Sequence, residues 1–375
     1  QVMQTLATAR LKHAPGEMSV YCNDGFTMVE PLVQAISGKS YPQFVNDEIL
    51  TPLGMSHSRY ASEFFAPGSY APGYAGEEKL PQEFVNVYAS GGLYTTPTEM
   101  AALARMLLNQ GVYNGKRLLS AASIAAMGQT QTGTELLRPV AMRDGFGLGW
   151  DGVRQGGLAE VGVTAWHKSG GTSIYTSNFF VLPDEGLALM ITGTASGYNS
   201  GTLAERILLQ ALVERSRLAA MPAALAVTTP AEMPASDAQL AEMASIYASY
   251  MALYRIEAQA DHTLTFSTYA AGGWSPEPAR LKLRTDGSFS SDAAPNTSYQ
   301  SVLAQGQRYL VERMPHGMGH YLVEFPYLQQ VSARTPLSAA WQGRLERRWL
   351  AVNEPANSLM LMLVPPVFTL AGATD

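Results

Sequence analysis

Cysteine, long apolar runs and clusters of basic residues are all scarce in this 375-residue chain. The single cysteine, Cys22, excludes an intramolecular disulfide framework and a zinc site made of four cysteines. No apolar stretch approaches the roughly 18–20 residues that a membrane-spanning helix needs, so we expect no transmembrane segment. The 25 basic and 31 acidic residues give a net charge of −6. Neither nucleic acid nor an anionic membrane surface is therefore expected as a partner.

Several well-known site motifs are also missing. No Gly-x-Ser-x-Gly elbow surrounds any serine, which leaves an α/β-hydrolase nucleophile unsupported. The glycine-rich run 145–150 lacks the final glycine of a dinucleotide-binding loop and follows no clear strand. His316 and His320 are four residues apart, but Gly317 and Gly319 argue against a helix that presents both to a metal. The sequence predicts no metal and no cofactor.

The first part of the chain, residues 1–217, alternates apolar helical patterns with glycine-rich loops. With 46% hydrophobic and 15% charged residues, the chain is typical of a folded protein of two or three domains. The pattern predicts helices at 30–37, 42–50, 100–108, 120–127 and 202–217, and strands at 164–169, 175–182 and 187–192. Strands that pair directly and then lead into a helix indicate an α/β (α+β) fold, with an antiparallel sheet flanked by helices.

A second domain is expected at 237–375, after a linker at 218–236 that is rich in Ala, Pro and Thr. Short alternating runs predict strands at 255–258, 263–267, 280–284, 308–313, 321–325 and 359–363, and a strand pair within 341–349. Their spacing favours a small antiparallel barrel or sandwich.

Two short runs stand out as candidates for chemistry. The first is Tyr21-Cys22-Asn23, which follows Pro15-Gly16-Glu17, and the second runs from His167 through Lys168, Ser169 and Gly170 to Gly171 at the edge of a predicted strand. Taken alone, each has an ordinary interpretation: a packed tyrosine ring with a wet hydroxyl, and a solvated lysine at a strand edge. Cys22 is more typical of small packing than of a nucleophile.

Together these runs resemble the serine β-lactamase and penicillin-binding-protein superfamily, and most closely its class C branch with DD-peptidases, D-aminopeptidases and esterases. That family carries Ser-x-x-Lys, Tyr-x-Asn and Lys-Thr-Gly motifs. Tyr21-Cys22-Asn23 matches the second motif, and Lys168-Ser169-Gly170 matches the third with Ser in place of Thr. The scaffold runs Pro52-Leu53-Gly54-Met55, Ala89 to Thr96 and Gly147-Leu148-Gly149-Trp150 agree in order over about residues 1–215.

The resemblance implies a role for each matching residue. Tyr21 would be the general base that takes the proton of a serine and later protonates the leaving group. Lys168 would stabilise the phenolate and attract a substrate carboxylate, and Asn23 would hold the substrate amide. The N–H of Gly171 would supply half of an oxyanion hole. The implied substrate-binding residues are His167, Ser169, Gly170 and Gly171.

No Ser-x-x-Lys motif is present, because none of the six lysines has a serine three places before it. We therefore expect an N-terminal fragment of the same precursor to supply that motif as a partner. Without it, the strands around Lys168 and Phe179 should have an open edge and an uncovered apolar face. The alternative is a pseudoenzyme or binding protein that retains a carboxylate-binding pocket.

The predicted function is that of a serine hydrolase that forms an acyl-enzyme with an amide or ester in a small molecule or peptide. A peptidase or esterase is favoured over a β-lactamase, although Ser169 keeps the hydroxyl of the family threonine and does not discriminate between them. The resemblance also implies a periplasmic or extracellular location. It further implies that the second domain is a lipocalin-like barrel, to which we assign no catalytic role.

Overall fold

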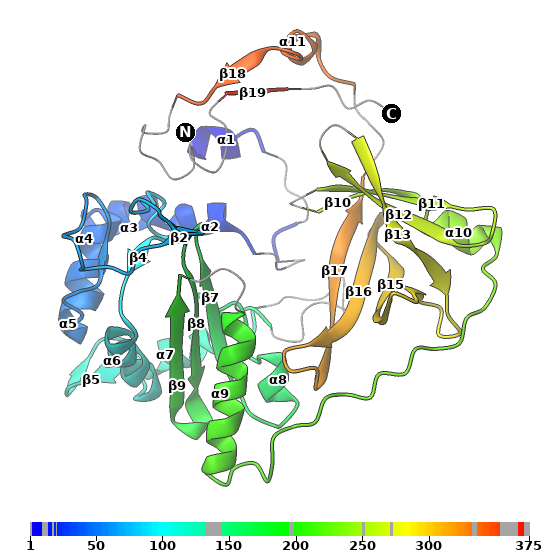
Figure 1. Ribbon diagram of the computed structural model, residues 1–375. Helices are drawn as coiled ribbons and strands as arrows, with labels where there is room; N and C mark the ends of the chain where they lie inside the picture. The colour runs from blue at the N-terminus through cyan, green and yellow to red at the C-terminus, as the bar shows by residue number, and fades with distance from the viewer. Residues whose placement is uncertain are drawn as a thin grey trace. The chain divides into compact units, whose positions relative to one another are not determined.

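The computed structural model describes residues 2–9, 14–16, 19, 21–131, 145–194, 199–249, 252–270, 273–331, 336–352 and 367–370. These residues form two compact units, the first built mainly from the chain up to Pro222 and the second mainly from the chain after it (Figure 1). Among the described helices, none is long and apolar enough to cross a membrane.

The first unit is a mixed structure of short helices, two-residue strand pairs and one larger sheet. Its helices are α1 (Val2–Leu6), α2 (Asn23–Thr27), α3 (Val29–Ser37), α4 (Tyr41–Val45), the π-helix η1 (Asn46–Leu50), α5 (Thr51–Leu53), α6 (Pro97–Leu108), α7 (Ala121–Met127), α8 (Gly156–Ala159), the 3₁₀-helix η2 (Pro183–Glu185) and α9 (Ser200–Glu214). Its strands are β1 (Arg59–Tyr60), β2 (Tyr74–Ala75), β3 (Glu78–Lys79), β4 (Leu93–Tyr94), β5 (Val112–Tyr113), β6 (Lys116–Arg117), β7 (Trp166–Gly171), β8 (Thr176–Leu182) and β9 (Leu187–Gly193).

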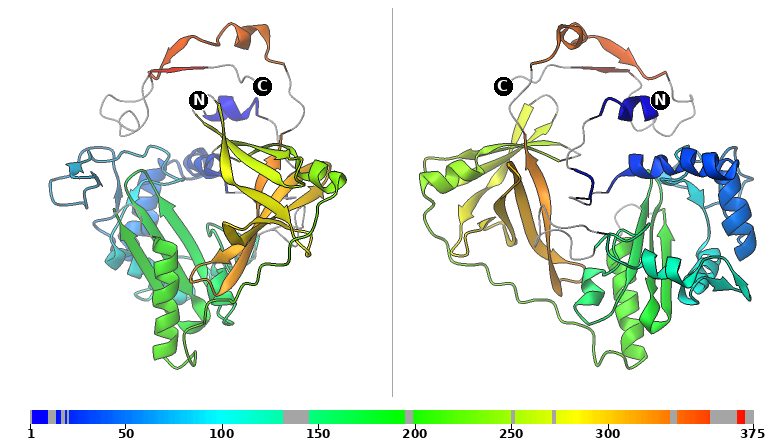
Figure 2. Two further views of the ribbon diagram at one scale, coloured as in Figure 1. Left: turned by 45° about the vertical axis from the view of Figure 1, so that its right-hand side comes forward. Right: turned by 180° about the vertical axis from the view of Figure 1, so that it is seen from behind.

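The larger sheet has the antiparallel order β7-β8-β9, with α6 packed on one face and α9 on the other (Figures 1 and 2). Phe179 and Val181 of β8 belong to the same apolar core as α6. On the opposite face, the Asn178 amide donates to the hydroxyl of Ser200 at the start of α9, at 2.8 Å. The expected antiparallel sheet with flanking helices is confirmed.

Local capping explains why the helices begin and end where they do. The hydroxyl of Thr96 accepts from the N–H of Glu99, so α6 begins at Pro97, three residues before the predicted start. The hydroxyl of Ser120 accepts from the N–H of Ser123, so α7 begins at Ala121, one residue after the predicted start. Gly38 ends α3 at φ +71°, a left-handed conformation that glycine adopts most easily.

Three details of the first unit differ from the sequence prediction. The single helix expected at 42–50 is divided into α4 and η1. β7 begins at Trp166 and continues through Gly170 and Gly171, because the turn lies further along, where the Thr172 N–H donates to the Tyr175 carbonyl at 3.0 Å. The expected uncovered face at Phe179 is wrong, because Phe179 is buried and its ring stacks on that of Trp150.

The second unit is a closed antiparallel barrel of eight strands, which confirms the expected small barrel. Around the barrel the strands are β10 (Ser245–Ala248), β11 (Leu253–Ala258), β12 (Leu264–Ala270), β13 (Gly273–Leu283), β14 (Phe289–Ser291), β15 (Ala294–Ala304), β16 (Gln307–His316) and β17 (Tyr321–Gln330). Helix α10 (Asp237–Met243) contributes Leu240 and Met243 to the barrel's apolar core.

The strand pair expected within 341–349 is wrong. The hydroxyl of Ser338 caps α11 (Ala339–Gln342), so this stretch opens as a helical turn. Strand β18 (Arg348–Leu350) then pairs with β19 (Val367–Thr369). The strand predicted at 359–363 and the residue Glu17 lie outside the described residues.

Candidate functional site

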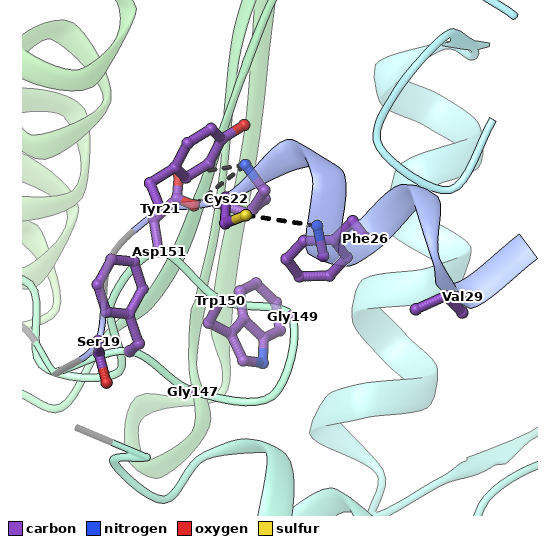
Figure 3. A pocket seen from close by; sticks show the side chains of 12 residues that line it. Ser19, Tyr21, Cys22, Phe26, Val29, Gly147, Gly149, Trp150 and Asp151 are labelled. Carbon is purple, nitrogen blue, oxygen red and sulfur yellow. Dashed lines mark hydrogen bonds and ion pairs between the residues drawn. The ribbon is translucent and has the colours of Figure 1, made fainter. Parts of the chain in front are cut away.

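A pocket of about 420 Å³ lies in the first unit, between the start of α2, the loop that precedes α8, and β7 (Figure 3). Its lining residues are Ser19, Tyr21, Cys22, Gly25, Phe26, Val29, Phe146, Gly147, Gly149, Trp150, Asp151 and Lys168. The pocket thus brings together Tyr21 and Lys168, which come from the two runs that the sequence singled out.

The loop 147–151 has a shape that only glycine permits at two positions. A Cβ atom at Gly147 would lie 2.4 Å from a methyl group of Val153 and 2.5 Å from the Met127 carbonyl oxygen. Gly149 has φ +84°, in the left-handed region. The resulting turn buries Trp150 against the sheet and presents Asp151 to the pocket.

Asp151 is the site residue that the sequence analysis missed. Its carboxylate lies 3.1 Å (Oδ1) and 3.2 Å (Oδ2) from the Lys168 ammonium, and it accepts the N–H and the hydroxyl of Ser169 at 2.8 and 2.5 Å. The Lys168 ammonium also donates to the Ser169 carbonyl at 2.5 Å. Asp151 directly follows the Gly147–Trp150 run, so its place beside a motif was the available signal.

Tyr21 and Cys22 stand at the N-terminal end of α2. The Cys22 sulfur accepts the N–H of Gly25 at 3.4 Å, which caps the helix (Figure 3). Tyr21 is 54% exposed, and the Lys168 ammonium lies 5.4 Å from the centroid of its ring. A cation at this distance from an aromatic face is attracted to it, so Lys168 is held between Tyr21 and Asp151.

Asn23 is exposed at the first position of α2 and does not line the pocket. Its backbone carbonyl accepts the hydroxyl of Ser90 at 2.8 Å, and that hydroxyl lies 2.7 Å from the hydroxyl of Thr27. Ala89 donates its N–H to the Glu30 carboxylate at 3.0 Å. The scaffold run 89–96 therefore fixes the position of the helices that carry the Tyr21 motif.

His167 does not reach the pocket. Its ring stacks on Phe180 of β8 with centroids 5.6 Å apart, whereas Lys168 is paired with Phe179 and lies on the other face of the sheet. The structure therefore separates His167 from the group formed by Tyr21, Asp151 and Lys168.

The backbone of β7 presents the N–H groups of alternate residues along one edge. His167 donates its N–H to the Gly152 carbonyl, and Ser169 donates its N–H to Asp151, both on the side away from β8. By this alternation the N–H of Gly171 points to the same edge. A Cβ atom at Gly171 would meet nothing within 4 Å, whereas one at Gly170 would lie 2.4 Å from the Ser177 hydroxyl.

Within the part of the chain that the structure describes, no group of three or more His, Cys, Asp or Glu side chains is placed to hold a metal ion. The pocket lining itself offers the phenol of Tyr21, the carboxylate of Asp151 and the ammonium of Lys168.

A family model described as Beta-lactamase matches residues 1–214. The chain belongs to the beta-lactamase family. This is a family of serine hydrolases, and membership agrees with the resemblance carried by the Tyr21 and Lys168 motifs.

Two curated relatives and one solved structure show how far the similarity extends. Penicillin-binding protein 4 of Amycolatopsis lactamdurans is 32% identical over 145 residues, covering 36% of this chain and 38% of its own length. The D-alanyl-D-alanine-carboxypeptidase/endopeptidase AmpH of Escherichia coli K12 is 30% identical over 108 residues, covering 29% and 28%. A crystal structure of SurE has a TM-score of 0.58 at 20% identity, covering 88% of this chain and 72% of that one, and this shows a shared fold. The similarity spans well under half the length of the two curated relatives.

Proposed function

We propose that the first unit supplies the proton-transfer, charge-stabilising and oxyanion groups of a serine hydrolase that forms an acyl-enzyme with an amide or ester. The observation that carries the proposal is that Tyr21 and Lys168, from motifs far apart in the sequence, meet in one pocket. The family and the relatives named as penicillin-binding protein and carboxypeptidase support it. We place the reaction in the periplasm or outside the cell, as the family resemblance implies.

The proposed reaction proceeds through two acyl transfers. The hydroxyl of a serine attacks the substrate carbonyl while Tyr21, as phenolate, takes its proton, and the Lys168 ammonium lowers the cost of the phenolate charge. The N–H of Gly171 donates to the developing oxyanion. Tyr21 then returns the proton to the departing amine or alcohol, and water later releases the acyl group from the serine by the same proton transfers in turn.

None of the six lysines in these 375 residues follows a serine at the required spacing, so the nucleophile of the proposed reaction lies outside them. We propose that a fragment of the same precursor supplies the Ser-x-x-Lys motif. Exposed apolar side chains of α2 and α3 support a docking role, because Phe26 is 42% exposed, Leu32 57% and Ile36 79%.

Denaturing intact-mass analysis of the natively purified protein, before and after incubation with an activated ester that carries no carboxylate, tests this proposal. We expect a polypeptide that carries Ser-x-x-Lys to gain the mass of the acyl group. Absence of an adduct on every polypeptide in the preparation would overturn the hydrolase assignment for this protein.

The second candidate function is that of a non-catalytic binding protein, and the missing Ser-x-x-Lys motif is the observation that favours it. It predicts saturable binding of a small ligand by the 375-residue chain alone, with no covalent mass increase. Absence of saturable binding would remove this candidate.

A further inference from the structure

The Asp151 carboxylate is itself bound by Lys168, to which the family resemblance assigns a substrate carboxylate, and by Ser169, which it assigns to substrate binding. The Ser169 hydroxyl, the Ser169 N–H and the Lys168 ammonium all direct hydrogens at its oxygens, at 2.5 to 3.2 Å. Oδ2 alone accepts all three of these donors. A carboxylate of the chain thus occupies the place where a carboxylate of a ligand would be bound.

We propose that Asp151 is a specificity residue that fills this anion position and makes the pocket select acyl substrates without a free carboxylate. The substrate class is then that of esters and of amides whose leaving group is uncharged. This inference rests on the proposed function and concerns the same pocket.

The backbone holds Asp151 in this place. The Asp151 N–H donates to the His167 carbonyl at 3.0 Å, and the His167 N–H donates to the Gly152 carbonyl at 2.8 Å, so residues 151 and 152 form a bridge with β7. The left-handed turn at Gly149 leads directly into this bridge. Asp151 and Lys168 thus both lie on backbone segments that are hydrogen-bonded to each other. Moving the Asp151 carboxylate away from Lys168 would break either these backbone hydrogen bonds or the three hydrogen bonds that Oδ2 accepts.

The charge balance explains the selectivity. The side chains of Asp151 and Lys168 are 17% and 34% exposed, so solvent screens their charges only in part. Their charges cancel, and a ligand carboxylate at Ser169 would meet Asp151 with like charge at hydrogen-bonding distance, which opposes binding. An uncharged carboxamide or ester brings no such charge and can accept the N–H of Gly171.

Calorimetric titration with two matched probes tests the inference on the purified protein. The probes are N-acetyl-D-alanyl-D-alanine and its C-terminal carboxamide, which differ only in the charge of that end. We expect the wild-type protein to bind the carboxamide more tightly than the acid. Asp151→Asn removes the negative charge but keeps an acceptor oxygen for Ser169, so it should tighten binding of the acid by about tenfold or more and leave the carboxamide within about twofold.

Asp184→Asn is the matched control, because it makes the same change of charge at an exposed position in η2, away from the pocket lining. It should leave both affinities unchanged. Equal or tighter binding of the acid by the wild-type protein would overturn the inference while leaving the pocket, and hence the proposed function, in place. This wild-type comparison stands even if Asp151→Asn does not fold. Absence of saturable binding of either probe to the wild-type protein and to Asp151→Asn would overturn both.

Discussion

Gly128 lies directly against the indole of Trp166: a Cβ atom at Gly128 would be 2.1 Å from Cζ2 of that ring. The ring centroids of Trp166 and Trp150 are 5.7 Å apart, and Trp150 lines the pocket. Because Gly128 has no side chain, the ring of Trp166 can pack directly against the backbone at position 128, next to Trp150. This contact links the end of α7 to the pocket floor.

We expect Gly128→Ala to lower the free energy of unfolding by about 1–3 kcal/mol, because the added methyl group overpacks a buried ring. The φ angle of Gly128 is −86°, so the backbone itself accepts alanine and the cost is steric. Gly91→Ala is the control, since a Cβ atom there meets nothing within 4 Å. Urea denaturation measures both variants, and equal stability of the two would contradict the packing argument.

The strongest sequence patterns predicted the parts of the fold that local chemistry determines. The end of the helix at residue 37 and the hairpin of β8 and β9 depend on neighbouring residues, so a single sequence reveals them. The motifs around Tyr21 and Lys168 were found because their spacing matches a family. That the two residues share one pocket follows from the tertiary fold, which neither short run contains.

Asp151 could not be predicted, because its role depends on contacts across the chain. Its place after the Gly147–Trp150 run marks the position but not the partner, and it is the bridge between Gly152 and His167 that brings Asp151 to Lys168. The division of the helix at 42–50 could not be predicted either. The π-helical turn at 46–50 hardly changes the spacing of apolar residues along the sequence, so the sequence carries no sign of it.

Tyr21→Phe should lower acylation by an activated ester by about 100-fold or more when the Ser-x-x-Lys motif is present, because the variant lacks the proton acceptor. The phenyl ring keeps the face that Lys168 contacts at 5.4 Å from its centroid, so the melting temperature should hardly change. Rates of covalent labelling, compared with the melting temperature, separate the two effects. Near-unchanged labelling would remove Tyr21 from the role of base.

Glu99 is expected to stabilise the first unit at neutral pH and to lose that effect in acid. Burial raises the pKa of its carboxyl, but hydrogen bonds from Ser58 and His57 outweigh burial and hold the pKa below its ordinary value of 4.5. A carboxyl with a lowered pKa contributes stability above its unfolded pKa and loses it as the pH falls through the folded one. Glu99→Ala should therefore cost about 1–3 kcal/mol at pH 7, where the Ser58 hydroxyl and the backbone N–H and ring of His57 lose their partner.

The measurement is the melting temperature of the wild type and of Glu99→Ala at pH 7 and pH 3. The gap between them should shrink at pH 3, because this pH lies below the ordinary pKa of the carboxyl, and the stabilisation is lost as the pH falls towards the lowered pKa of the folded state. A matched control is Glu48→Ala, whose carboxylate is exposed and pairs with Lys39 at the surface. A gap of the same size at both pH values would show that Glu99 acts through packing alone.

Glu312 presents the opposite case inside the barrel. Its side chain is buried opposite Tyr299, and burial raises the pKa of its carboxyl, although the hydrogen bond with Tyr299 works in the other direction. A raised pKa means that stability is complete below the ordinary value of 4.5 and is lost as the pH rises through the folded pKa. Glu312→Gln, which is neutral at every pH, should therefore melt at a higher temperature than the wild type at pH 8 and at the same temperature at pH 4.

Glu277→Gln, at an exposed position on β13, is the control and should show no such difference. Calorimetric melting at the two pH values decides the matter, and a Glu312→Gln variant that is less stable at pH 8 would mean that the charged carboxylate is a favourable part of the barrel interior.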